Sequence, residues 1–156
     1  MKRKIPLLCL LIVFLLTNIT FAAMPSITAD RQYFDVNTGL QVLSGNVHIE
    51  HKGRTVTAGE AKTNMVEIWG SGGITFTQDD IYFSGDSVYV YFPNHLAQIN
   101  GGVSFSRDGI KITADKVNFN WDTKIADFNG NVCVAQGNTT WTADSASYNV
   151  AANTFN

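Results

Sequence analysis

Ile112-Thr113-Ala114-Asp115 is the clearest of five copies of a four-residue motif that recurs along this 156-residue chain. The other copies are Ile27-Thr28-Ala29-Asp30, Val56-Thr57-Ala58-Gly59, Phe83-Ser84-Gly85-Asp86 and Trp141-Thr142-Ala143-Asp144, and successive copies start 29, 27, 29 and 29 residues apart. A period of roughly 20 to 50 residues indicates one supersecondary unit stacked on copies of itself. A single unit cannot bury its apolar face alone, so the copies must build a common core.

A second motif, in which glycine precedes alternating apolar residues, lies between the copies of the first. Its cleanest copy is Gly130-Asn131-Val132-Cys133-Val134, and the others are Gly45-Asn46-Val47-His48-Ile49, Gly72-Gly73-Ile74-Thr75-Phe76 and Gly101-Gly102-Val103-Ser104-Phe105. Both motifs lie in runs rich in β-branched and aromatic residues, and turn pairs such as Asp108-Gly109 separate the runs. The pattern predicts an all-β chain, an antiparallel meander of nine or ten strands.

The apolar positions change parity within each strand that carries the first motif. Ile112 and Ala114 are followed by Val117 and Phe119, so the alternation slips by one residue after Asp115. Such a slip moves the side chains to the opposite face unless a bulge absorbs it. We therefore predict a bulge or corner after each Ala-Asp or Gly-Asp step, which would fold the meander into two facing sheets or a V-shaped trough.

The N-terminal segment is typical of an export signal. Lys2, Arg3 and Lys4 precede an apolar run at residues 7–16, and the small residues Ala22 and Ala23 follow. We expect a signal peptide at residues 1–23 and one domain at residues 24–156. The alternative is an uncleaved anchor, because residues 5–23 approach the roughly 20 residues that a membrane-spanning helix needs.

Charge and cysteine content restrict the function of the exported domain. Removal of the three basic signal residues leaves 8 Lys and Arg against 13 Asp and Glu, a net charge near −5. An acidic domain without basic clusters argues against nucleic acid as a partner. Cys133 is the one cysteine of residues 24–156, so no internal disulfide is expected. Cys133 alternates with Val132 and Val134 along its strand and should therefore face the opposite side of the sheet, which predicts a partly exposed thiol.

Catalytic and metal-binding patterns are weak in this sequence. His48 and Glu50 share a strand face, but His51 falls at a turn and no fourth ligand is apparent, so no metal site is expected. We find no nucleophile elbow, paired carboxylates or cysteine-histidine pair, and the glycine pairs do not precede helices. The sequence therefore predicts neither an enzyme nor a cofactor.

The two motifs, iterated behind an export signal, resemble the OstA-like family and in particular its LptA-like members. The resemblance covers the chain from Ile27 to Val150. It implies a periplasmic protein with a twisted, open β-jelly roll whose apolar groove holds the acyl chains of lipopolysaccharide. It also implies head-to-tail self-association, or pairing with LptC-like and LptD-like β-jelly rolls, in a bridge from the inner membrane to the outer-membrane translocon.

The alternation assigns residues to an inner face and to the two edges of the meander. The predicted lipid-binding inner face consists of Val47, Ile49, Ile74, Phe76, Phe83, Val103, Phe105, Ile112, Val132 and Val134. The predicted partner edges are marked by Ile27 and Phe34 in the first strand and by Trp141 and Tyr148 in the last. The small residue at the third motif position, such as Ala114, would either leave room for lipid or permit close approach of the sheets.

Two other functions are compatible with the pattern. The inner residues could simply interdigitate as the filled core of an exported structural or adhesin-like repeat protein. Alternatively, retention of the N-terminal segment would give an LptC-like subunit anchored in the inner membrane. The first alternative differs from lipid transport in whether the interior accepts a ligand.

Overall fold

The computed structural model describes residues 26–51 and 53–156. The predicted signal peptide lies outside these residues. The described chain consists of thirteen strands and one 3-10 helix, η1. Their bounds are β1 Ser26–Thr28, β2 Arg31–Asp35, β3 Leu40–His51, β4 Arg54–Thr63, β5 Glu67–Ser71, β6 Ile74–Gln78, β7 Ile81–Gly85, β8 Ser87–Tyr91, η1 Phe92–Asn94, β9 Leu96–Arg107, β10 Ile110–Asn120, β11 Ile125–Gln136, β12 Thr139–Asn149 and β13 Thr154–Phe155. In the described ranges, no helix has the length and apolar character to cross a membrane.

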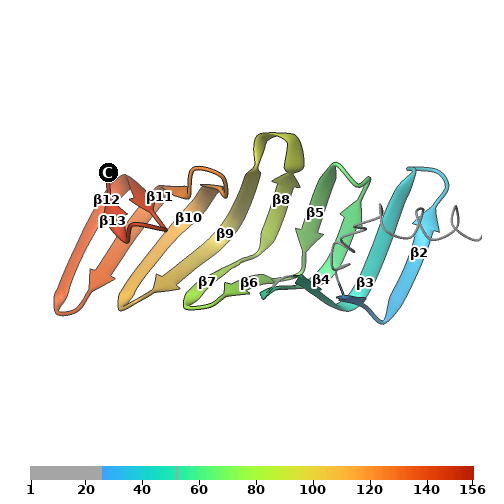
Figure 1. Ribbon diagram of the computed structural model, residues 1–156, viewed down its shortest axis with the longest axis horizontal. Helices are drawn as coiled ribbons and strands as arrows, with labels where there is room; N and C mark the ends of the chain where they lie inside the picture. Colours follow the sequence, from blue (N-terminus) through green and yellow to red (C-terminus); the bar gives the residue numbers. More distant parts are fainter. Residues whose placement is uncertain (1–25, 52) are drawn as a thin grey trace, which may run out of the picture.

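All strands belong to one antiparallel sheet that runs along the long axis of the molecule (Figure 1). β1 and β2 both pair with β3, β5 and β6 both pair with β4, and β7 and β8 both pair with β9. Each of these couples therefore forms one interrupted column. The predicted all-β meander is confirmed, since the thirteen segments occupy ten columns in sequence order.

The predicted corners occur where the two motifs meet. The pairing of β10 with β11 shifts register between Thr113 and Lys116, and the pairing of β3 with β4 shifts between Ser44 and Val47. At these points the glycine and the residue after it both have positive φ, for example 78° at Gly130 and 48° at Asn131. Glycine and asparagine tolerate this left-handed conformation better than other residues, which explains why they occupy the corner.

The corners divide the sheet into two halves that face each other. Half-sheet A contains β1, β6, β7 and segments such as residues 110–114 of β10. Half-sheet B contains β2, β5, β8, β13 and segments such as residues 116–120 of β10. Aromatic rings meet across the interior: the ring centroids of Phe105 and Phe128 are 5.8 Å apart, and those of Phe83 and Phe119 are 5.5 Å apart. The result is the expected open β-jelly roll.

Candidate functional site

An unbroken row of apolar side chains crosses the inner face of half-sheet A. Residues that lie directly opposite each other on neighbouring strands point to the same face of a sheet. The register joins Ile27, Ile49, Val56, Phe76, Phe83, Phe105, Ile112, Val134 and Trp141 in this way. The sheet therefore offers a continuous apolar strip from its first column to its ninth.

A matching row faces it from half-sheet B. The register there joins Phe34, Gln41, Thr63, Ile68, Val90, Ala97, Phe119, Ala126 and Tyr148. The row is aromatic towards the C-terminus, where Phe119 and Tyr148 lie, and contains the polar residues Gln41 and Thr63 towards the N-terminus. The two rows together define the space in which a ligand could be held.

The interior is filled in its C-terminal part, which we call the closed region. Phe105, Phe128 and Tyr148 are completely buried, and the centroid of the Phe105 ring is 5.3 Å from that of Tyr148. Phe83 and Ile112 are buried beside them. Protein side chains therefore occupy this part of the trough.

The N-terminal part of the trough is less covered, and we call it the open region. Ile27 is 42% exposed and Phe34 is 59% exposed, although both belong to the inner rows. Ile49 and Phe76 are half-buried and pack at the margin of the core. The inner face therefore has partly exposed apolar surface at this end.

The ten residues predicted for the inner face all lie on it. Eight of them are buried: Val47, Ile74, Phe83, Val103, Phe105, Ile112, Val132 and Val134. The other two, Ile49 and Phe76, are half-buried. On the opposite face, the Cys133 thiol is free and partly exposed, as predicted.

Phe34 belongs to the site as well as to the edge. The sequence contains an indication of this role. Phe34 lies seven residues after the start of its copy of the first motif, and Phe119 and Tyr148 lie at the same offset in their copies. Those two residues lie in the same inner row. Alignment of the repeat columns would therefore have assigned Phe34 to the inner face.

The prediction of Tyr148 as an exposed edge residue is wrong. Its side chain is completely buried, because β13 pairs with β12 at this position and the Phe155 ring lies 5.1 Å from the Tyr148 ring. Burial raises the pKa of the Tyr148 phenol above its ordinary value. Within β12, the part around Trp141, which is 36% exposed, remains an open edge among the described residues.

A short hydrogen-bonded chain holds the closed region together at its C-terminal end. The Tyr148 hydroxyl donates to Asn153 Oδ1, and Asn153 Nδ2 donates to Asp108 Oδ2 over 3.2 Å. The Val150 N–H donates to the Lys124 carbonyl over 2.8 Å. The loop after β12 therefore connects the turn at Asp108, at the end of half-sheet A, to half-sheet B.

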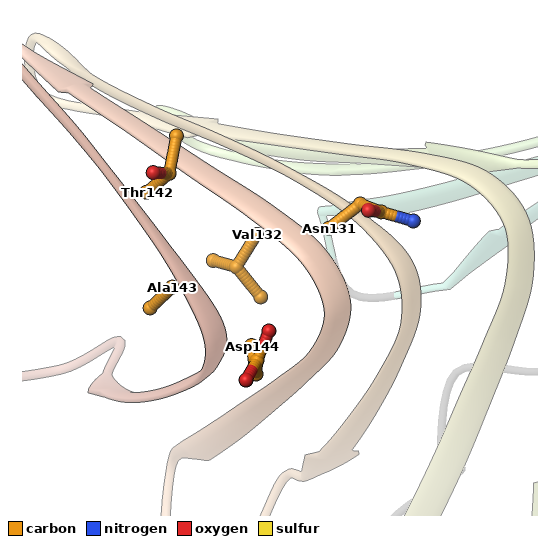
Figure 2. A pocket seen from close by; sticks show the side chains of 5 residues that line it. All are labelled: Asn131, Val132, Thr142, Ala143 and Asp144. Carbon is orange, nitrogen blue, oxygen red and sulfur yellow. The ribbon is translucent and has the colours of Figure 1, made fainter.

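Two surface hollows lie at the corners. One has a volume of about 470 Å³ and is lined by Asn131, Val132, Thr142, Ala143 and Asp144 of β11 and β12 (Figure 2). The other, of about 380 Å³, is lined by residues that include Gly59 and Gly72. The second hollow lies where the motif has glycine in place of aspartate, so the missing side chain contributes to it.

Comparisons with known proteins agree with this architecture. Twenty-one chains of solved structures match at a significant level. Among them is LptH from Pseudomonas aeruginosa, the LptA-homologous periplasmic component of the lipopolysaccharide transport device, with a TM-score of 0.62. The match covers 77% of this chain and 94% of LptH at 12% sequence identity, so it establishes a shared fold.

No curated protein matches this sequence at a significant level. A family model described as "OstA-like protein" matches residues 57–155. This stretch includes the last three copies of the first motif in full, and all of the second copy except its first residue, Val56. This stretch is more than half of the chain. The protein therefore belongs to the OstA-like family.

Proposed function

We propose that this protein is a periplasmic lipopolysaccharide carrier that holds acyl chains against the open region of its trough. The observation that carries the proposal is the partial exposure of the apolar inner row at its N-terminal end, where Ile27 is exposed and Ile49 and Phe76 are half-buried. LptH, which shares the fold, is described as a component of a lipopolysaccharide transport device. Family membership and this surface together favour lipid transport over catalysis.

The free energy of acyl-chain burial is sufficient for binding without charge contacts. Transfer of a methylene from water to an apolar surface contributes about 0.8 kcal/mol, so a chain of a dozen carbons contributes up to roughly 9 kcal/mol. An acidic domain can therefore bind an anionic lipid through its tails while the headgroup remains in water.

The closed region favours a second candidate, a structural protein with a filled core. Phe105, Phe128 and Tyr148 are completely buried there, and lipid could reach them only if the two half-sheets separated. We therefore assign the ligand to the open region, and expect Phe105 to contact lipid less than Ile49 does.

Transport further requires contact with neighbouring proteins. We propose that residues 1–23 direct export and are removed, that residues 24–156 form the transport domain, and that exposed sheet edges receive partner strands. Trp141 at one edge and Ile27 at the other have the exposure that such contacts need. Self-association and pairing with LptC-like or LptD-like β-jelly rolls are the arrangements that the family suggests.

In-cell photo-crosslinking tests the lipid site. A crosslinking residue at Ile49, on the inner face, should capture lipopolysaccharide, whereas the same residue at His48, exposed on the opposite face, should not. Phe76 provides a second inner position, and Phe105 should give a weaker adduct than either. Equal labelling at Ile49 and His48, or none at Ile49 and Phe76, would remove the lipid-carrier proposal and leave the structural one.

A further inference from the structure

Three of the corners inside the chain carry the aspartate of the first motif, and we call them aspartate corners. At each of them a glycine of the following strand packs against the aspartate. The Asp30 N–H donates to the Gly45 carbonyl over 2.8 Å. The Asp86 N–H donates to the Gly101 carbonyl over 2.9 Å. A Cβ added at Gly45, Gly101 or Gly130 would overlap Oδ2 of Asp30, Asp86 or Asp115, respectively, and all three glycines have φ of 77–79°. The corner therefore requires glycine for both space and backbone conformation.

The residue after this glycine completes the contact in two of the copies. Asn46 Nδ2 donates to Asp30 Oδ2 over 2.9 Å, and Asn131 Nδ2 donates to Asp115 Oδ2 over 2.8 Å. A hydrogen bond to a charged carboxylate is stronger than one between neutral groups. The aspartate of one strand thus recognises a Gly-Asn pair on the next.

Asp144 is the same corner residue in the last copy of the motif, but its counterpart is not present among the described residues. β11 pairs with one side of β12, and on the other side β13 reaches only Tyr148 and Asn149. Residues 139–144 consequently have no strand on that side in the described chain. Asp144 is exposed, no described side chain donates a hydrogen bond to its carboxylate, and the larger corner hollow lies beside it (Figure 2).

The first strand of a second copy would not reproduce this corner contact at the edge. Eight successive antiparallel pairings lead from β1 to β12, so the two strands run in the same direction. Continuation of the sheet by a second copy would set β12 beside a parallel strand. It would also set Asp144 beside a strand with an aspartate corner, Asp30, which offers no glycine and carries the same charge.

We propose that Asp144 is a specificity-determining residue that selects an antiparallel partner strand of the Gly-Asn type, supplied by a different protein. This inference rests on the edge contact of the proposed function and is independent of lipid binding. The partner strand places glycine opposite Asp144, donates an asparagine amide to its carboxylate, and continues with alternating apolar residues beside Trp141. It repeats at the edge the contact that β10 and β11 make inside the chain.

A peptide titration followed by fluorescence anisotropy tests the inference on the purified protein without lipid. The probe is a peptide with the sequence of residues 129–136 and Cys133→Ser. A double-mutant cycle combines two changes: Asn131→Gly in the peptide and Asp144→Ala in the protein. Asp144→Ala should weaken binding of the probe, which carries Asn131, about tenfold, because this complex loses a charge-assisted hydrogen bond. The same change should weaken binding of the Asn131→Gly peptide about threefold or less, because that complex has no such bond to lose. Asp127→Ala, which removes another exposed carboxylate, from β11, is the charge-matched control and should change neither affinity.

Two further peptides complete the design. Gly130→Ala in the probe should weaken binding at least tenfold, and a peptide with the sequence of residues 26–35 should not bind. Binding of the 26–35 peptide in preference to the probe would retain edge-strand addition but overturn the selection by Asp144. Equal affinities of both probes for the wild-type and Asp144→Ala proteins would also overturn it. Failure of every peptide to bind would reject edge addition itself, while the crosslinking result at Ile49 would stand separately.

Discussion

The closed and open regions are built from the same repeat, yet the interior is completely packed in one and partly exposed in the other. In the closed region Phe105 meets Phe128 and Tyr148, and the loop at Asn153 joins the two half-sheets. In the open region the facing row holds the polar residues Gln41 and Thr63, and its one aromatic residue, Phe34, is largely exposed. A repeat therefore specifies the path of the backbone, whereas the size of the facing side chains decides whether the interior is full.

The largest expected difference between the regions concerns core truncation. Phe128→Ala removes a completely buried ring from the closed region, and should lower the free energy of unfolding by about 3–5 kcal/mol. Phe34→Ala removes a 59% exposed ring from the open region, and should change it by no more than about 0.5 kcal/mol. Urea denaturation of both variants measures the contrast. Similar losses for the two would mean that the open region is packed in solution.

A smaller effect is expected at the corners that join the half-sheets. Gly130→Ala forces a side chain into the left-handed conformation and against Asp115 Oδ2, and should cost about 2 kcal/mol or more. Gly109→Ala is the matched control, because Gly109 has the same φ of 78° but no atom within 4 Å of an added Cβ. Gly109→Ala should lower the free energy of unfolding by only about 1 kcal/mol, the conformational cost of a side chain at positive φ. Equal destabilisation by the two changes would show that the aspartate contact contributes nothing.

The smallest effect is the alkaline pH dependence that Tyr148 contributes in the closed region. Because burial raises the pKa of Tyr148, the folded state holds this proton more tightly than the unfolded state does. The corresponding stability is complete below the ordinary tyrosine pKa of about 10 and is lost as the pH rises through the folded-state pKa. Tyr148→Phe should reduce this alkaline decrease in the free energy of unfolding.

Tyr33→Phe provides the comparison in the N-terminal half, where the Tyr33 side chain is 53% exposed. Urea denaturation at several pH values between neutral and alkaline separates the two variants. If Tyr33→Phe and Tyr148→Phe reduce the alkaline decrease equally, the burial of Tyr148 is not its cause.

Much of the fold was predictable because the repeat constrains it at several levels. The glycine and aspartate spacing predicted the corners, and the alternation around Val132 and Phe105 predicted the inner face. These features depend on local backbone conformation and on period-two facing, both of which are visible in sequence.

The division into open and closed regions was not predictable in the same way. It depends on which side chains meet across two half-sheets, and the contact between Phe105 and Tyr148 joins residues 43 positions apart in separate strands. The burial of Tyr148 depends in addition on β13, a pairing of only two residues that carries little pattern of its own. Such contacts follow from the assembled geometry and not from a motif.

The aspartate-glycine corner also bears on how proteins of this architecture change length during evolution. Each corner needs only its two neighbouring strands, so duplication or loss of one 29-residue unit leaves every other corner intact. A unit adds two strands, and the direction of the terminal strands is therefore preserved. Trough length can drift while the direction of both terminal strands, and with it the geometry of the two sheet edges, stays the same.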